Sequence, residues 1–452
     1  MAAVYYFISD LHIGGDDELQ ECAFESELIA FLQSLAETDE DAELIINGDL
    51  FGLWEFTQVT GLAKLDSLVE HHPELFEQFR KTGETVQITL IPGNHDAELA
   101  GYPDYVTRLA AYNIDLQNEI HLVRAVGSRR IWIEHGMQED PNNRLPQFGN
   151  PFANPPGYFV NQRVTGKAGQ LSERGKYNWL KDIQSVTPMD DIPWWMISNY
   201  YYREMSPFLR YASLPFLLLF NVTLLWVAGA TLEHVGILNT QVFSNPDLFR
   251  QFGFVGEAFN LVLLLNFVIM GLLIALSIPV FFLLRDAKQT LRRFGLLSSE
   301  KVVQEEDAHY VDAALEVFST HPNVAAFIYG HTHRPSLRRI DSRAIINTGT
   351  WLKRFDRIPV RFGLLPPVYR PSFCLNYFRL SADEDRVVVE YQTIEKETPH
   401  ELTPLQRVLV GRKQPLAPIP ERTVLEPADD RVVDEAVSPV SRQPGRGPGR
   451  PA

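Results

Sequence analysis

Apolar runs of strand length alternate with amphipathic helical patterns along most of the chain. The run Val4–Ile8 is followed by apolar residues at helical spacing between residues 18 and 36. Further strand-like runs cover residues 44–47, 86–91, 130–134, 324–329, 344–346 and 387–391, and residues 299–320 have helical periodicity. Because strands that alternate with helices are typical of layers in which helices cover a sheet, the sequence predicts an α/β fold of the layered α+β kind.

Two long apolar stretches without a charged residue, 211–232 and 258–284, interrupt this pattern. As helices they would measure about 33 and 40 Å, which exceeds the ~30 Å hydrocarbon core of a membrane. Lys and Arg residues lie on both outer flanks, whereas Arg250 is the only Lys or Arg between the stretches. Since positive charge favours the cytoplasmic side, we predict a two-helix transmembrane hairpin in the lipid bilayer with both flanks in the cytoplasm. Two buried helices of a soluble core, or a hairpin within one leaflet, are the alternatives.

These patterns divide the chain into four parts. The α/β pattern covers residues 1–195 and resumes over residues 296–411, on either side of an insertion, 196–295, that holds the two apolar helices at about 211–232 and 258–284. Proline recurs through residues 412–452, a composition that cannot bury a core and is predicted to be disordered. The first strand begins at Val4 with no signal peptide before it, so we expect a multi-pass membrane protein with both termini in the cytoplasm.

Composition excludes several classes of protein. Apolar residues make up 45% of the 452 residues, which excludes wholesale disorder. The formal charge of −16 argues against a nucleic-acid-binding protein, because gripping a phosphate backbone needs a basic surface. With two cysteines, Cys22 and Cys374, the chain cannot form a disulfide framework or a thiolate-based zinc finger.

Polar signatures follow the ends of several predicted strands. They are Asp10-Leu11-His12, Gly48-Asp49, Gly93-Asn94-His95-Asp96, His135-Gly136 and Gly330-His331-Thr332-His333. Each alone is a weak signal, because a lone Gly-Asp is usually a turn and a lone histidine is usually structural. Strand ends of an α/β sheet meet at one edge, however, and the donors that these signatures bring there suit Mn²⁺, Fe or Zn²⁺ rather than Ca²⁺. Together they supply about as many ligands as two adjacent metal ions need when one carboxylate is shared.

In this order the signatures resemble the calcineurin-like metallophosphoesterase superfamily, over residues 4–136 and about 296–392. The resemblance implies a metallophosphoesterase β-sandwich flanked by helices, interrupted here by the predicted membrane hairpin, with a dinuclear metal centre at one edge. It places Asp10, His12 and His333 at one metal ion. Asn94, His135 and His331 are placed at the other, and Asp49 between the two.

The resemblance also implies an activity, the hydrolysis of a phosphate ester or pyrophosphate by attack of a metal-activated hydroxide. The expected ions are two Mn²⁺, with Fe or Zn²⁺ as alternatives. His95 would lie beside the metals and, as an imidazolium, stabilise the charged transition state or protonate the leaving oxygen, with Asp96 favouring its protonated form. The alternative for His95 is a purely structural role near the ligands.

Two segments, residues 48–54 and 330–335, resemble UDP-2,3-diacylglucosamine pyrophosphohydrolases within that superfamily. Those enzymes have Arg where this chain has His95, and they lack an obvious spanning hairpin. The resulting hypothesis is a membrane-anchored phosphoesterase whose catalytic domain faces the cytoplasm and whose substrate is a phosphorylated or lipid-linked small molecule. The alternatives are a non-catalytic membrane scaffold with the same fold, and a phosphodiesterase or phosphoprotein phosphatase that acts on soluble substrates.

Overall fold

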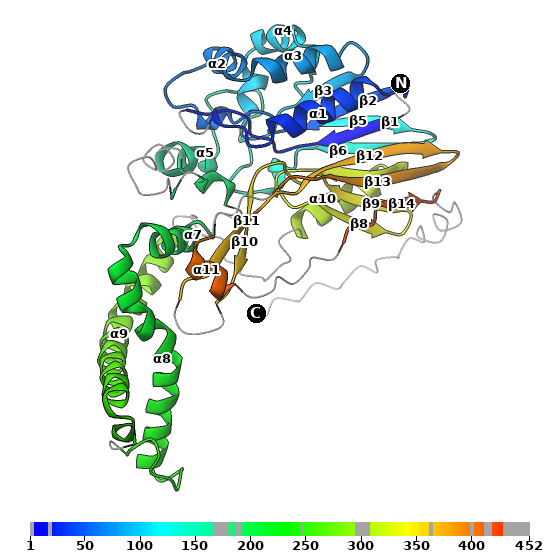
Figure 1. Ribbon diagram of the computed structural model, residues 1–452. Helices are drawn as coiled ribbons and strands as arrows, with labels where there is room; N and C mark the ends of the chain where they lie inside the picture. Colours follow the sequence, from blue (N-terminus) through cyan, green and yellow to red (C-terminus); the bar gives the residue numbers. More distant parts are fainter. Residues whose placement is uncertain are drawn as a thin grey trace, which may run out of the picture.

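Two β-sheets lie face to face, and helices cover the outer side of each (Figure 1). This arrangement comes from a computed structural model, which describes residues 4–16, 20–165, 179–180, 182–186, 191–245, 248–293, 308–360, 365–397, 402–410 and 418–427. The mixed α/β fold predicted from the sequence is confirmed.

The first sheet contains seven described strands and combines parallel with antiparallel pairing. Four strands from the first part of the chain run parallel to one another, and three strands from the last part extend the sheet with antiparallel pairs. In spatial order they are β14 (Arg422–Leu425), β13 (Arg386–Ile394), β12 (Leu375–Asp383), β1 (Val4–Ile8), β2 (Ala42–Asn47), β3 (Gln87–Ile91) and β4 (Ile114–Leu116).

Strand β1 shows why both faces of this sheet are covered. Its side chains alternate between the faces, so Tyr6 and Ile8 pack among the outer helices while Tyr5 and Phe7 pack against the second sheet. A strand buried on both faces reads as a continuous apolar run, which is how it appears in the sequence. The outer helices are α1 (Glu25–Ala36), α2 (Ala63–His71), α3 (Pro73–Thr82) and α4 (Asp104–Ala110).

The second sheet joins strands from before and after the insertion. Its spatial order is β5 (His121–Val126), β6 (Arg129–Glu134), β7 (Val324–Tyr329), β9 (Arg343–Asn347) and β8 (Ser336–Ile340). Strand β7 lies parallel to β6, although nearly two hundred residues separate them, and helix α10 (Ala308–Thr320) packs on the outer face. The pairing brings the residues that follow β6 next to those that follow β7, since the backbone N–H of Gly330 donates to the carbonyl of His135 at 2.9 Å.

The insertion forms a helical extension that projects away from the two sheets (Figure 1). It consists of α8 (Pro207–His234) and α9 (Gly253–Arg293), with α7 (Ile192–Asn199) at its base, whereas α5 (Pro156–Val160) lies earlier in the chain. Helices α8 and α9 lie side by side, and the Asn266 amide donates to the Thr223 hydroxyl between them at 3.1 Å. At its base, α7 packs on the ribbon of β10 (Arg354–Ile358) and β11 (Val368–Ser372), where Trp195 contacts Phe355. Helix α11 (Pro404–Leu409) follows the last long strands.

The prediction of two membrane-spanning helices is wrong. Of the helices formed by the described residues, none combines the length with the apolar character that crossing a membrane needs. The multi-pass location predicted from the same stretches is corrected with it. The two apolar stretches do form helices, because a long apolar run favours a helix, but it does not by itself specify what surrounds the helix. Both helices also extend beyond the uncharged stretches, to Glu233 in α8 and to Glu257 in α9.

The prediction of a disordered tail from residue 412 onward is wrong for one segment. Residues 422–425 form β14 on the edge of the first sheet, where Leu425 is fully buried opposite Val387. The guanidinium of Arg129 donates to the carbonyl of Glu426 at 3.0 Å and holds the segment from the other sheet. The short run Thr423-Val424-Leu425 is enough to form one edge strand. The average composition of residues 412–452 does not reveal so short a run. Residues 411–417 and 428–452 lie outside the described residues.

Candidate metal centre

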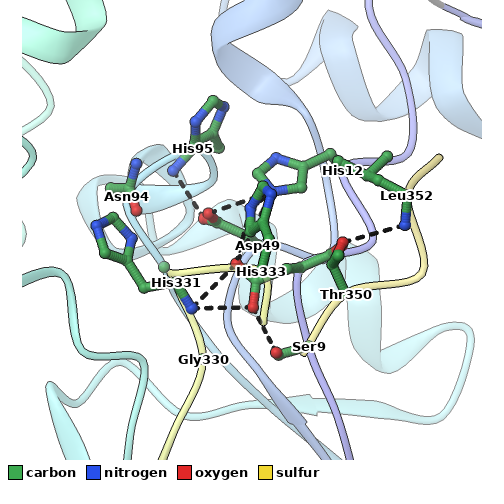
Figure 2. A network of polar contacts seen from close by, with 12 residues as sticks. Ser9, His12, Asp49, Asn94, His95, Gly330, His331, His333, Thr350 and Leu352 are labelled. Carbon is green, nitrogen blue, oxygen red and sulfur yellow. Dashed lines mark hydrogen bonds and ion pairs between the residues drawn. The ribbon is translucent and has the colours of Figure 1, made fainter. Parts of the chain in front are cut away.

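The predicted ligand residues converge at one edge of the two sheets (Figure 2). Asp10 and His12 follow β1, Asp49 follows β2, and Asn94 follows β3 in the first sheet. In the second sheet, His135 follows β6, and His331 and His333 follow β7. All these residues lie just beyond the carboxyl ends of their strands, which is where α/β folds place ligands. The structure thus brings together all seven residues that the sequence predicted as metal ligands.

Asp10, His12 and His333 form the first group of potential ligands. The Nε2 atoms of His12 and His333 are 3.1 Å apart, and Nε2 of His333 lies 3.3 Å from Oδ1 of Asp10. Ring nitrogens and a carboxylate oxygen that face one another at this spacing are arranged as donors around a common point. Nitrogen and oxygen donors of this kind suit a first-row divalent ion.

Asp49, His135 and His331 form the second group, and Asn94 adjoins it. Nε2 of His135 lies 3.2 Å from Oδ2 of Asp49 and 3.2 Å from Oδ1 of Asn94. Nδ1 of the same ring lies 2.9 Å from the carbonyl oxygen of Asn47, an acceptor only, so Nδ1 carries the proton in that contact. In the neutral ring this leaves the Nε2 lone pair directed at the group.

The Asp49 carboxylate lies between the two groups. Its Oδ2 atom is 3.7 Å from Nε2 of His12 in the first group and 3.2 Å from Nε2 of His135 in the second. Its other oxygen, Oδ1, accepts a hydrogen bond of 2.8 Å from the backbone N–H of His95, which fixes the orientation of the carboxylate. One oxygen shared by two donor groups is the geometry that a bridging ligand needs.

Electrostatics show that the site attracts positive charge. Burial raises the pKa of the Asp10 and Asp49 carboxyls, but neighbouring imidazoles, above all His135, outweigh burial and hold both pKa values below the usual range. Burial lowers the pKa of His135, yet Asp49 and Asp10 outweigh burial and raise it to about 10, so a proton on this ring compensates the two buried carboxylates. Burial lowers the pKa of His12 to about 3, which keeps that ring neutral and able to donate a lone pair. Two buried carboxylates among imidazoles therefore fit a site for divalent cations.

Backbone strain is concentrated at the same residues. Eight non-glycine residues in the described part of the chain have a positive φ, and five of them are potential ligands: Asp10 (54°), His12 (47°), Asp49 (53°), His331 (66°) and His333 (58°). This left-handed region is sparsely populated by residues with a side chain. Strained residues persist where the surrounding structure holds them, and they cluster at functional sites.

His95 lies beside the two groups, and its carboxylate partner is Glu55. Nδ1 of His95 is 2.9 Å from Oε1 of Glu55, in the short helix η2 (Leu53–Glu55), and the indole of Trp54 covers the ring with centroids 4.3 Å apart. The ring also stands edge-on to His12, with centroids 4.5 Å apart. Burial lowers the pKa of His95, but Glu55 and then Asp49 outweigh burial and raise it to about 9.

Asp96 favours the protonated form of His95 through its charge, but its carboxylate makes its contacts elsewhere. Its buried carboxylate accepts hydrogen bonds from the backbone N–H groups of Gly93 at 2.6 Å and of Asp49 and Phe51 at 3.3 Å each. It adds a smaller charge effect on His95, after those of Glu55 and Asp49. Asp96 thus ties the loop after β3 to the loop after β2 and fixes the position of Asp49.

The calcineurin-like phosphoesterase profile matches residues 4–229, which is half of the chain. The chain belongs to this family. Membership confirms the superfamily that the sequence resembles, and with it a hydrolase and metal-binding character. Members typically hold two divalent metal ions, and the two donor groups described above fit that requirement. His331 and His333 lie outside the matched residues but inside the same cluster of side chains.

Solved structures resemble this family member only distantly. A conserved protein from Streptococcus pneumoniae TIGR4, described as a predicted phosphoesterase, is 10% identical, with 89% of this chain and 95% of that chain covered and a TM-score of 0.27. Vps29 from Chaetomium thermophilum is 9% identical, with 88% and 90% covered and a TM-score of 0.27. A putative 5'-nucleotidase from Staphylococcus aureus is 12% identical, with 90% and 57% covered and a TM-score of 0.29. No curated protein matches the chain significantly.

Sequence reasoning missed two carboxylates of this phosphoesterase site. Glu55 contacts His95, and Asp140, which follows the short helix η4 (Met137–Glu139), lies with Oδ2 3.1 Å from Nε2 of His331. Each stands a few residues beyond a ligand signature, six after Asp49 and five after His135. This closeness in sequence to a ligand signature is the signal that the sequence offers. It does not reveal which of the nearby carboxylates contact the site.

Proposed function

We propose that this chain is a dinuclear-metal phosphoesterase that hydrolyses a phosphate ester or pyrophosphate. The observation that supports it most directly is the position of Asp49, whose Oδ2 atom lies within 4 Å of ring nitrogens from both donor groups (3.7 and 3.2 Å). A carboxylate placed in this way suits two neighbouring cations better than one. Family membership supports the same reaction class.

We assign the proposed ligands to two metal ions, one for each donor group. Asp10, His12 and His333 would hold one ion, and Asn94, His135 and His331 the other, with Asp49 shared. Mixed oxygen and imidazole donors favour Mn²⁺, with Fe or Zn²⁺ as alternatives. When bound, such a pair of ions polarises the phosphoryl group and makes a water-derived nucleophile available at neutral pH.

The protein's own contribution begins with the orientation of the two carboxylates. The backbone N–H of His95 donates to Asp49, and the backbone N–H of His331 donates to both oxygens of Asp10 at 3.1 and 3.0 Å. Ser9 donates to Oδ2 of Asp10 as well, and the hydroxyl of Thr350 donates to the Asp10 carbonyl at 2.6 Å. These contacts hold the carboxylates in place before a ligand arrives, so little reorganisation is needed during the reaction.

His95 is proposed as the general acid that donates a proton to the leaving oxygen. Glu55 holds Nδ1, so the other ring nitrogen, Nε2, remains to give a proton. The ring lies against His12, one of the proposed ligands, and Trp54 covers it. A positioned proton donor of this kind typically accelerates a reaction by about 10²- to 10⁴-fold.

A phosphorylated small molecule is the proposed substrate. The resemblance of residues 48–54 and 330–335 to pyrophosphohydrolases supports including a pyrophosphate, free or lipid-linked, among the compounds to be tested. The formal net charge of the chain, −16, argues against a polyanionic substrate such as a nucleic acid.

The test is metal-dependent hydrolysis by the purified full-length protein. Release of product from an aryl phosphomonoester, an aryl phosphodiester and a nucleotide-sugar pyrophosphate would be measured with Mn²⁺, with Zn²⁺ and with a chelator. We expect hydrolysis of at least one compound that the chelator abolishes and Mn²⁺ restores. Changing Asp49→Ala should lower the rate by more than the roughly 100-fold that changes outside the ligand set can cost.

The matched control is Asp66→Ala, since Asp66 is an exposed carboxylate that pairs with Arg108 at the surface. It should leave the rate unchanged. Absence of hydrolysis in every condition, together with absence of bound metal in the folded protein, would contradict the proposal and favour a non-catalytic scaffold.

A further inference from the structure

Asp140 connects two parts of the chain that are far apart in sequence. Its Oδ2 atom lies 3.1 Å from Nε2 of His331, across a separation of 191 residues. The same oxygen accepts a hydrogen bond from the side-chain amide of Asn143 at 2.7 Å, and Oδ1 accepts one from the backbone N–H of Asn142 at 2.8 Å. The carboxylate is therefore fixed from its own loop before it meets the imidazole.

The loop around Asp140 is itself braced against its surroundings. The backbone N–H of Arg144 donates to the carbonyl of Asp140 at 2.7 Å, and the backbone N–H of Gly157 donates to the carbonyl of Asn142 at 2.9 Å. The Asp140 side chain is 24% exposed, so it is partly shielded from water. A carboxylate held in this way differs from a mobile surface ion pair, whose energy is small because both partners move.

The contact decides which nitrogen of His331 carries the proton. A carboxylate accepts hydrogen bonds, so Nε2 beside Asp140 is the protonated nitrogen of the neutral ring, and Nδ1 has the lone pair. Nδ1 is buried and has no hydrogen-bond partner among the described residues. The ring belongs to the donor group that also contains Asp49 and His135. A buried nitrogen lone pair without a donor costs free energy unless something else occupies that position.

We propose that Asp140 is a positioning residue that fixes the tautomer and orientation of His331 and thereby sets the affinity of the second donor group for its metal ion. The inference rests on the proposed function, because it assumes that this group binds a cation. Outer partners of metal-binding histidines act by fixing the ring and by making the ligand nitrogen more basic. His135, in the same group, is oriented by a neutral partner, the backbone carbonyl of Asn47. The partner of His331, Asp140, is a charged carboxylate.

The experiment compares metal binding in full-length variants. Wild type, Asp140→Ala, Asp140→Asn and the control Glu139→Gln would be stripped of metal, and Mn²⁺ stoichiometry and affinity measured by competition with a fluorescent chelator. We expect the wild type to bind two equivalents. Asp140→Ala should bind one of the two equivalents about 10- to 100-fold less tightly than the wild type does and leave the other nearly unchanged. Asp140→Asn should weaken it less, because an amide oxygen can still accept the Nε2 proton. Glu139→Gln, which changes the neighbouring carboxylate, should match the wild type.

A second measurement separates positioning from a structural role. Nitrogen NMR of metal-free protein with labelled histidine should show the Nε2-protonated tautomer for His331 in the wild type and a mixture in Asp140→Ala. The thermal midpoints of the metal-free proteins should agree. Equal weakening of both equivalents with a lowered midpoint would overturn the proposal in favour of a structural contact.

The outcomes distinguish this proposal from the proposed function. If the wild type binds two equivalents and Asp140→Ala binds both as tightly, the positioning role fails and the proposed function stands. If the folded wild type binds no Mn²⁺, Fe or Zn²⁺, the proposed function fails, and the role of Asp140 fails with it.

Discussion

Oε1 of Glu55 lies 2.9 Å from Nδ1 of His95, and the same oxygen accepts a hydrogen bond from the side-chain amide of Asn161 at 3.0 Å. The three residues come from three separate segments, and the Glu55 carboxylate is almost fully buried. A buried carboxylate is stable only with hydrogen-bond or charged partners. His95 and Asn161 therefore stabilise the Glu55 carboxylate, and Glu55 in turn orients the His95 ring. The imidazole therefore stands in a fixed orientation beside the metal-binding groups.

Changing Glu55→Gln should lower kcat by about 10- to 100-fold and leave KM nearly unchanged. The amide keeps the shape but removes the charge that holds His95, and a positioned proton donor contributes about 10²- to 10⁴-fold in all. Separate measurement of kcat and KM on an aryl phosphodiester checks this prediction. In a His95→Ala background, Glu55→Gln should have almost no further effect, because residues that act as one unit are not additive. An equal loss in both backgrounds would show that Glu55 acts through general stability.

Changing Gly330→Ala should weaken metal binding and destabilise the fold. A Cβ atom on Gly330 would lie 2.5 Å from Oδ2 of Asp10 and 2.7 Å from Oγ of Ser9, so the proposed ligand must move. Overpacking of this kind costs about 1–3 kcal/mol. The matched control is Gly271→Ala in α9, where an added Cβ meets nothing within 4 Å and should stabilise the helix by up to about 1 kcal/mol. Denaturant unfolding and metal titration measure both effects, and wild-type metal affinity in Gly330→Ala would contradict the prediction.

Changing Leu425→Ala should destabilise the protein by about 2–5 kcal/mol, as expected when a buried leucine is truncated. Leu425 is fully buried in the core between the two sheets, although it lies near the end of a proline-rich segment. The control Val408→Ala truncates a side chain that is 83% exposed and should change the free energy of unfolding by less than about 0.5 kcal/mol. A shift of similar size in both variants, measured by urea unfolding, would mean that β14 adds little to the fold.

Cys22 should resist alkylation in the folded protein at mildly alkaline pH. Burial raises the pKa of its thiol to about 12, so the reactive thiolate is scarce at any pH well below that value. Treatment with iodoacetamide followed by peptide mass spectrometry should leave Cys22 unmodified until the protein is unfolded. Rapid modification of Cys22 in the folded state would contradict the raised pKa of its thiol.

The sequence predicted the buried strands and the site better than the edges of the sheets. The runs Val4–Ile8 and Val324–Tyr329 agree with β1 and β7, because strands covered on both faces are apolar throughout. Strand β8 (Ser336–Ile340) was missed because it is an edge strand with Arg338 and Arg339 exposed, and edges of that composition lack an apolar signal. The long hairpin of β12 and β13 was recognised in one part only, since its outward residues are polar.

The positions of the seven proposed ligands were predictable because each lies within a few residues of the end of a strand. Glu55 and Asp140 were not, because their carboxylates reach the site through loops whose course depends on tertiary packing. Asp96 does favour the protonated form of His95, as predicted, but the sequence did not reveal that its carboxylate also accepts hydrogen bonds from backbone amides. The spanning hairpin was a wrong prediction for a related reason: length and apolarity identify a helix without identifying its surroundings.

Strand β7 lies between β6 and β9 in the finished sheet, and Asp140 and His331 meet across 191 residues of chain. During synthesis, the ribosome therefore releases β1 to β6 nearly two hundred residues before β7, which joins β6 to the rest of the second sheet. Until β7 has emerged, β6 presents an open edge to its surroundings, and the nascent protein holds carboxylates and imidazoles whose partners do not yet exist. Both sheets are thus finished only after β7 and the strands that follow it in the chain, β8, β9, β12, β13 and β14, have been added.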